Sequence, residues 1–320
     1  MMKRLILAGA ACLTLSAPLA AAEDFPRAAL HMVVPFSAGG TTDVAARVIA
    51  KGLSEEIGQA VVVENRPGAG TKIGSNYVAQ SRPDGYTLLL HTIALAVSPF
   101  LNNEPDYDYR KEFDPVARVY VSPVFLTLSP TVPASNIKEF VDYLKENEQT
   151  PYGTAGIGSA MHIAVELLRE RTGTDLLHVP YKGESEVLTN LVSGEVKFAF
   201  TGASASLGFI ESGKLKSLGY AGEQRSPLAP ELPTISEAGL DGFVAQTWGV
   251  VLAPVGTPQP VVEKINQALN KALSRPDLRE KLIQLGYESI VDSTPAGTDE
   301  YIIKETKKYS GVMKNSMPKN

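Results

Sequence analysis

Residues 31–53 read HMVVPFSAGGTTDVAARVIAKGL, and this stretch decides the fold. An apolar run is followed by a loop of small residues and then by a helical pattern with one apolar face. Residues 152–171, YGTAGIGSAMHIAVELLRER, follow the same plan. A helix N-terminus presents backbone N–H groups without intrahelical partners and the positive end of the helix dipole, so it favours anions. The repeated plan predicts two lobes that clamp a small anion between them.

The first 22 residues have the pattern of a secretion signal peptide. Lys3 and Arg4 form a charged start, residues 5–17 are mostly apolar, and three alanines at 20–22 form a small-residue cleavage site. The apolar run is too short to span a bilayer comfortably, and no later run approaches twenty apolar residues. We therefore expect an exported chain whose mature part is not embedded in a membrane.

The single cysteine, Cys12, lies inside this signal. A lipidated cysteine usually has a large aliphatic residue three positions before it, and Cys12 does not, so we expect no lipid anchor. The mature chain then has no cysteine, and its stability must come from a buried core rather than from disulfides. Removing the signal leaves 28 basic and 35 acidic residues, a net charge of −7 against −5 for the whole chain. This acidic balance argues against nucleic acid as a partner, and an anionic ligand must be held by local groups.

Strand-like apolar runs alternate with helical patterns, which predicts an α/β fold of βαβ units with a mostly parallel sheet. Residues 102–114 are expected to form a surface loop, and the extended run 116–128, interrupted by Pro123, is expected to cross into a second lobe. The expected strands lie at 32–34, 61–63, 86–90, near 152, and at 176–180, 197–201 and 249–252. The expected helices lie at 43–56, 73–80, 137–146, 160–171, 184–193, 260–274, 277–285 and 297–314.

Two crossings between the lobes predict a hinge. Residues 23–124 and 248–320 would form the first lobe and residues 125–247 the second, with the ligand cleft between them. Both glycine-rich loops follow predicted strands, and open α/β sheets bind ligands at the carboxyl ends of their strands.

The first loop combines residues suited to a ligand site. Pro35 ends the strand, the glycines at 39 and 40 let the backbone turn and approach a ligand, and Asp43 suits the first turn of the helix. Thr41 or Thr42 can cap that helix. A capped strand–helix turn without any ligand accounts for the loop equally well. A phosphate loop is disfavoured because no Gly-Lys-Ser/Thr follows the glycines.

The second loop offers hydroxyl groups from Thr154 and Ser159 together with backbone N–H donors. Taken alone it is also accounted for by helix capping, but two such loops, one in each lobe, favour a ligand clamp. Residues 68–74 come near to a dinucleotide fingerprint but are one residue too long, so we expect residues 65–74 to supply a turn and a cap.

Enzyme and metal motifs are missing from the sequence. There is no Gly-x-Ser-x-Gly elbow and no zinc spacing among the histidines, so we predict no catalytic residue, no metal and no cofactor. We expect structural roles for His31 and His178 beside strand cores, and a capping or packing role for His162. His91 follows a strand directly and is a candidate ligand contact. For Trp248 we expect core packing, with cleft lining as the alternative.

Several longer motifs resemble one protein family, the periplasmic solute receptors of tripartite tricarboxylate transporters, also called the TctC or Bug family. The resemblance covers essentially the whole mature chain. It is carried by VP at 34–35, GGTTD at 39–43, VENRPGAG at 63–70, PDGYTLL at 83–89, YGTAGIGS at 152–159, His162, VPYKG at 179–183, PTISEAG at 233–239 and APVGTP at 253–258.

The resemblance implies a type II periplasmic binding fold that closes over an organic acid. It implies that the loop at 36–41 grips one ligand carboxylate through backbone N–H groups and ordered waters, and that the loop at 154–159 closes from the second lobe. One departure is Thr201-Gly202, where the family often has Asp-Asn; another is His91, where many members carry a small or hydroxyl residue. Ligand specificity should therefore differ here, and an aromatic dicarboxylate such as terephthalate or a linear one would both fit.

The expected function is that of a monomeric receptor that binds an organic carboxylate, most simply a dicarboxylate, and delivers it to a membrane permease. A ligand sensor for a signalling partner, or a hydrolase or isomerase on the same scaffold, are the alternatives. The residues predicted to bind the ligand are Phe36, Ser37, Ala38, Gly39, Gly40, Thr41, Asp43, His91, Thr92, Thr154, Ala155, Gly156, Ser159 and Thr201.

Overall fold

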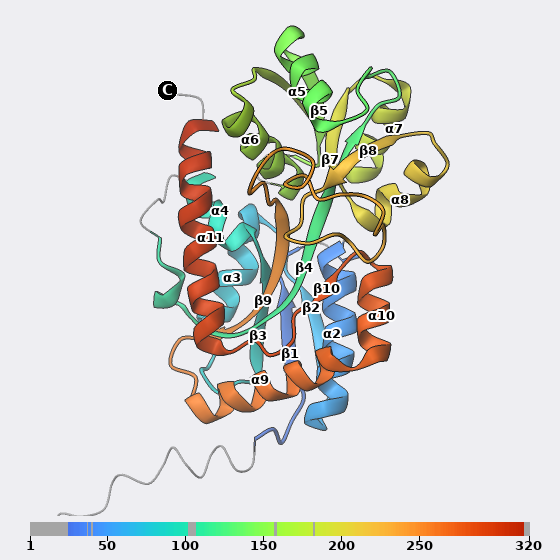
Figure 1. The fold of residues 1–320 in the computed structure, drawn as a ribbon. Helices are drawn as coiled ribbons and strands as arrows, with labels where there is room; N and C mark the ends of the chain where they lie inside the picture. Colours follow the sequence, from blue (N-terminus) through green and yellow to red (C-terminus); the bar gives the residue numbers. More distant parts are fainter. Residues whose placement is uncertain are drawn as a thin grey trace, which may run out of the picture.

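The computed structural model describes residues 25–36, 38–39, 41–101, 107–156, 159–181 and 183–316 as a two-lobed α/β protein (Figure 1). The predicted signal peptide, with Cys12, lies outside these residues. The strands are β1 (Leu30–Val34), β2 (Val61–Asn65), β3 (Thr87–Thr92), β4 (Phe113–Leu128), β5 (Thr150–Thr154), β6 (Leu176–Pro180), β7 (Phe198–Gly202), β8 (Lys216–Tyr220), β9 (Gln246–Pro254) and β10 (Glu288–Ser289).

Helices cover both faces of the sheet in each lobe (Figure 1). They are α2 (Thr41–Ile57), α3 (Lys72–Ala79), α4 (Ala94–Leu101), α5 (Ile137–Glu146), α6 (Ala160–Thr172), α7 (Glu184–Ser193), α8 (Ala203–Glu211), α9 (Gln259–Ser274), α10 (Pro276–Gln284) and α11 (Pro295–Ser316), with short 3₁₀ turns η1 (Ala69–Thr71) and η2 (Tyr109–Lys111).

The first lobe is built on strands that alternate their side chains between two buried faces. In β1, Met32 and Val34 pack into the core beneath α2 and α9, whereas Val33 packs into the core that includes α3, α4 and α11. Strand β3 does the same with Leu88 and Leu89. Since successive side chains of a strand point to opposite faces, an all-apolar run is the pattern expected of a strand buried on both faces.

The strand β4 joins the two lobes and is continuous through Pro123. It pairs antiparallel with β9 from Phe113 to Pro123, and with β7 and β8 from Val124 onward. Proline has no N–H to give to a ladder, and here it stands where the strand changes partners, so the interruption expected at Pro123 does not occur. The loop expected at 102–114 is also wrong in part, because Tyr109 is buried in η2 and β4 already begins at Phe113.

Across the described residues the strands form one sheet in the order β2-β1-β3-β9-β4-β7-β5-β6, with β8 and β10 paired to β4. The β1–β2, β1–β3, β5–β6 and β5–β7 pairs are parallel. The expected α/β class and parallel βαβ units are therefore confirmed. The expectation of a mostly parallel sheet is wrong, because β9 runs antiparallel to β3 and β4, and β4 runs antiparallel to β7, β8 and β10. The lobe boundaries at 124/125 and 247/248 stay a prediction, and the partner change of β4 lies beside the first of them.

Both glycine-rich loops lie where parallel strands end. Strand β1 ends at Val34 and α2 begins at Thr41, while β5 ends at Thr154 and α6 begins at Ala160. Each loop thus leads from the carboxyl end of a strand into the first turn of a helix, as the sequence pattern predicted. In the part of the chain that the structure describes, none of the helices combines the length and the apolar character that a membrane crossing requires.

Candidate functional site

The first loop is held in place by Asp43, in the first turn of α2. Asp43 is 2% exposed, and its carboxylate accepts hydrogen bonds from the Gly39 N–H at 2.8 Å and from Asn65 Nδ2 at 3.0 Å. Arg47, one turn further along α2, donates to both carboxylate oxygens. The Asn65 amide also donates to the Phe36 carbonyl at 3.1 Å, so that β2, the loop and α2 are joined at one point.

The Asp43 carboxyl is ionised in this setting. Burial alone would raise its pKa, but the hydrogen bonds from Arg47, Gly39 and Asn65 outweigh burial and hold the pKa below its usual range. Because both oxygens are occupied by donors of the protein, Asp43 organises the loop. A direct ligand contact of Asp43 stays a prediction, and an anion near the loop would meet a carboxylate whose charge Arg47 balances.

The donors of the first loop are not all directed outward. Gly39 has φ +77°, a conformation that glycine adopts without steric cost, and its N–H points inward to Asp43. The first turn of α2, beginning at Thr41, therefore supplies the N–H groups that have no intrahelical acceptor. Ser37 and Gly40 lie outside the described residues, and the predicted contacts of Ala38 and Thr41 stay predictions.

His91 belongs to β3 rather than following it, because the strand continues to Thr92 and pairs with β9. Its ring is 1% exposed, and burial lowers its pKa to about 4, so the ring is neutral at physiological pH. The Thr92 N–H donates to Nδ1 at 2.9 Å, and Nε2 lies 3.2 Å from Thr71 Oγ1. The ring of Phe36 meets it edge-on at a centroid distance of 6.1 Å, which ties His91 to the first loop.

Thr71 reaches His91 from a strained backbone. Ala69, Gly70 and Thr71 all have positive φ, and Thr71 has φ +80°, which a β-branched residue rarely adopts. Residues 65–74 do supply a turn, as expected, and Thr71 precedes α3, but its side chain makes no capping hydrogen bond. The hydroxyl is used for His91 instead of for the helix end.

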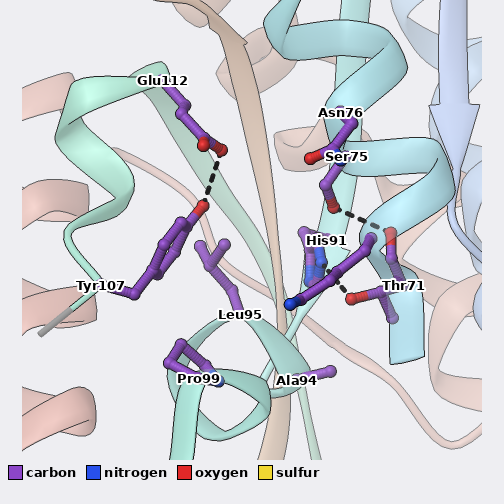
Figure 2. Close-up of a pocket in the computed structure, with 10 residues that line it drawn as sticks. Thr71, Ser75, Asn76, His91, Ala94, Leu95, Pro99, Tyr107 and Glu112 are labelled. Carbon is purple, nitrogen blue, oxygen red and sulfur yellow. Dashed lines mark hydrogen bonds between the residues drawn. The ribbon is translucent and has the colours of Figure 1, made fainter. Parts of the chain in front are cut away.

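A pocket of about 310 Å³ opens beside His91 (Figure 2). This volume is at the lower end of the ~300–1,000 Å³ typical of small-molecule sites. Ser75 and Asn76 line one side, and Tyr107 donates to Glu112 at 2.9 Å on the other. The full lining is Thr71, Lys72, Ser75, Asn76, His91, Ala94, Leu95, Pro99, Tyr107 and Glu112.

The second loop is braced by Thr154, whose side chain is fully buried. Its Oγ1 accepts the Gly156 N–H at 3.1 Å and lies 2.6 Å from His178 Nε2. Ser159 caps α6 by accepting the His162 N–H at 3.2 Å. As in the first loop, a glycine N–H points inward to a buried side chain, while the helix begins directly after the loop. Ligand contacts of Ala155 and Gly156 stay predictions.

Aromatic rings stack behind the second loop. His178 lies parallel to Tyr152 at 5.0 Å and tilted against His162 at 4.7 Å. His162 Nε2 is 3.7 Å from the buried Glu166, which also accepts from Arg169. Burial lowers the pKa of His162 to about 4. The structural roles expected for His162 and His178 are confirmed.

Three other residues considered in the sequence analysis lie on inner strands of the sheet. Thr201 is fully buried and its hydroxyl lies 2.6 Å from that of Thr127 on β4, so its predicted ligand contact gains no support from this geometry. Trp248 is fully buried and donates to Glu305, as expected for a core residue. His31 is not in a core: its side chain is 46% exposed and pairs with Glu64 on the neighbouring strand.

Four residues of these networks were not singled out from the sequence: Arg47, Asn65, Thr71 and Glu184. Glu184 lies in the first turn of α7 and accepts a hydrogen bond from the N–H of Gly202, the residue that follows Thr201. Burial raises the pKa of the Glu184 carboxyl. Two of the four residues carry a local signal: Glu184 is an acidic side chain in a first turn, and Arg47 lies four residues after Asp43 on the same helix. Asn65 and Thr71 act across the fold. Within the described ranges no three His, Cys, Asp or Glu side chains gather as a metal site.

Comparison with known proteins places this geometry in a family. Residues 45–316 match the model described as "Tripartite tricarboxylate transporter family receptor" (TctC). A protein from Pseudomonas sp. strain P51, described as "UPF0065 protein in tcbD-tcbE intergenic region", is 39% identical over 90% of this chain and 87% of its own.

Two solved structures from Rhodopseudomonas palustris are similar in fold and sequence. MatC with bound malate is 31% identical, with a TM-score of 0.76 over 90% of this chain and all of its own. Rpa4515 with adipate is 32% identical, with a TM-score of 0.78 over 91% of this chain and 98% of its own. With its two-lobed sheet and its two strand–loop–helix turns, this chain belongs to the TctC family of tripartite tricarboxylate transporter receptors.

Proposed function

We propose that this protein is a periplasmic receptor that binds a small organic dicarboxylate between its lobes and delivers it to the membrane permease of a tripartite transporter. One observation carries the proposal: two loops at the carboxyl ends of parallel strands each lead into a helix, and a buried side chain fixes each from behind. Asp43 fixes the first loop and Thr154 the second. Such loops hold helix N-termini ready for an anion without rearrangement.

The ligand class follows from relatives and from charge. MatC was solved with malate and Rpa4515 with adipate, and both ligands are dicarboxylates. The chain itself is acidic, with a formal charge of −5, so long-range attraction does not bring an anion in. Short-range donors must provide the affinity, and two carboxylates allow one to be held by each lobe. We expect the neutral His91 and the adjacent pocket to influence which dicarboxylates bind, by selecting the chemical group that links the two carboxylates.

We infer that the bound acid leaves unchanged. The family consists of receptors, and the neutral, buried His91 is packed against Phe36 and Thr71. A hydrolase or isomerase would turn over a bound acid, and that turnover would disappear in a His91→Ala variant. Analysis of the acid by mass spectrometry after long incubation distinguishes the two, since a receptor returns it intact.

A thermal-shift panel on the purified mature protein tests the ligand class. Malate, adipate and terephthalate are compared with adipamide, which has the length of adipate but no charge. Ligand that binds only the folded state stabilises it by RT ln(1 + [L]/Kd), so at 100 Kd the gain is about 2.7 kcal/mol. We expect a concentration-dependent rise in Tm for at least one diacid and none for adipamide. Equal shifts with adipamide, or no shift with any acid, would contradict the proposal.

A further inference from the structure

The buried Thr154 hydroxyl, at the end of β5, has three polar neighbours. The Gly156 N–H donates to Oγ1 across 3.1 Å, His178 Nε2 lies 2.6 Å from Oγ1, and the Gly156 carbonyl oxygen lies 3.3 Å away. The Thr154 side chain is 0% exposed, so water does not substitute for any of them. The direction of each hydrogen bond is therefore decided inside the protein.

A hydroxyl carries one proton and two lone pairs. The Gly156 N–H takes one lone pair, so the proton of Thr154 must go either to His178 Nε2 or to the Gly156 carbonyl. A separation of 2.6 Å is that of a strong hydrogen bond, whereas 3.3 Å is long. The Gly156 carbonyl already accepts from the Ser159 N–H at 3.2 Å. In the opposite arrangement Nε2–H would donate to Oγ1, and the Thr154 proton would have only the long contact to the Gly156 carbonyl. We therefore assign the Thr154 proton to His178, with Nε2 bare and the ring proton on Nδ1.

The surroundings of His178 favour this neutral ring. Pairing of β5 with β6 sets His178 opposite Tyr152, on which it stacks, and His162 of α6 covers it from another side. The nearby charged groups on α6 are Glu166 and Arg169, which pair with each other, and Arg169 also approaches Asp175. Burial lowers the pKa of His178.

We propose that His178 is a positioning residue for the second loop: its bare Nε2 accepts the Thr154 proton and so keeps Thr154 Oγ1 directed at the Gly156 N–H. The Gly156 turn, at φ +106°, is held in one geometry ahead of α6, and carboxylate binding benefits from that fixed geometry. The last step rests on the proposed function, whereas the hydrogen-bond arrangement does not. His178 contacts no ligand in this account and acts through Thr154.

Two amide variants separate this role from simple packing. His178→Gln places an acceptor oxygen near the position of Nε2, whereas His178→Asn is one methylene too short to reach Thr154. His178 is half-buried on the edge strand β6, so both variants should fold. We expect the dicarboxylate Kd of His178→Gln to stay within about threefold of wild type. We expect that of His178→Asn to rise about tenfold, because Thr154 Oγ1 then gives its proton to the Gly156 carbonyl and no longer stays directed at the Gly156 N–H. Equal effects of the two variants would overturn the proposal.

The matched control is the same pair of substitutions at His31, which is exposed on β1 and pairs with Glu64. Neither His31→Gln nor His31→Asn should change the Kd. A Gln–Asn difference at His31 as large as that at His178 would show that the measurement does not report on the second loop, and would overturn the assignment.

Nuclear magnetic resonance tests the hydrogen bonds without any ligand. In ¹⁵N-histidine-labelled protein at pH 7, the signals lost in His178→Gln identify His178, and we expect them to report the Nδ1–H tautomer. Both variants remove the ring current of the imidazole, so the Gly156 amide proton should shift in both, but clearly further in His178→Asn, which also loses the acceptor. An Nε2–H tautomer, or equal shifts of the Gly156 amide in the two variants, overturns the proposal. If these signals behave as expected while no carboxylate binds, the proposed function fails and the positioning role stands.

Discussion

At the scale of single residues, both loops are organised in the same way: a glycine N–H points inward to a side chain that the fold has buried. Asp43 receives the Gly39 N–H and Thr154 receives the Gly156 N–H. The glycines could be singled out from the sequence because a run of small residues between a strand and a helix indicates a tight backbone turn. Asn65 and Thr71 could not, because their partners Phe36 and His91 lie 29 and 20 positions away and are met only in the folded chain.

Gly39 offers a direct test because a matched glycine exists. Gly39 and Gly58 have φ of +77° and +76°, and a Cβ at either would meet no atom within 4 Å. Valine at each position should therefore cost a similar ~1–2 kcal/mol of unfolding free energy, the strain of the left-handed conformation. We expect Gly39→Val alone to raise the dicarboxylate Kd at least tenfold, measured by calorimetry. Similar losses of affinity in Gly58→Val would indicate a global effect and contradict the role of the first loop.

His91 predicts how stability depends on pH. Its pKa is lowered from 6.5 to about 4 by burial, so the unfolded chain takes up a proton below pH 6.5 while the folded protein resists until about pH 4. The contribution of the neutral His91 ring to the free energy of unfolding is therefore fully present above pH 6.5. It is lost as the pH falls toward 4, and the free energy of unfolding then decreases at a slope approaching 1.4 kcal/mol per pH unit. His162 acts in the same direction. We expect urea unfolding of His91→Gln to show a shallower decline between pH 6 and 4.5 than wild type. An identical decline would contradict the burial argument.

At the scale of elements, amphipathic helices were predicted well and uniformly apolar or short ones were missed. Helices α5 and α9 have a clear apolar stripe, whereas α4 reads ALAVSPFL, which is apolar all round and contains Pro99. A hydrophobic run of that length does not distinguish a helix from a buried strand. Helix α8 was missed because its first half is only alanine and serine and its large apolar residues are confined to the second half, and β10 because it has only two residues. Pro123 misled for a different reason: it forms the last pair of β4 with β9, and from Val124 the strand pairs with β7, so the proline stands at a change of partner and does not end the strand.

Substitutions at two helix caps of the second lobe distinguish an effect on folding stability from an effect on ligand binding. Ser159 caps α6 after the second loop, and Asn136 caps α5 by accepting the Glu139 N–H at 2.9 Å. Replacing either by alanine should cost about 1 kcal/mol of unfolding free energy. Only Ser159→Ala should also weaken dicarboxylate binding, because α6 begins directly after the second loop. Chemical denaturation and calorimetry on both variants check this, and an equal loss of affinity in Asn136→Ala would show that general loosening of the lobe is responsible.

At the scale of the whole molecule, one sheet runs through both lobes and only a few segments connect them, chiefly β4 and β9 (Figure 1). Connections of this kind permit hinge closure, and a ligand that contacts both lobes binds the closed form better and shifts the population toward it. The expected α/β class followed from alternating strand and helix patterns. The order of the strands, β1-β3-β9-β4-β7-β5, did not, because no local pattern contains it.

The central claim is that the two loops together hold an organic dicarboxylate, and isothermal titration calorimetry of the mature protein tests it most directly. Malate, adipate and terephthalate would be titrated into wild type, Gly39→Val and Gly58→Val. We predict that at least one diacid binds wild type and Gly58→Val saturably at one site per chain, and binds Gly39→Val at least tenfold more weakly. Folded wild-type protein that gives no saturable heat with any dicarboxylate, or binding that Gly39→Val leaves unchanged, would contradict the account.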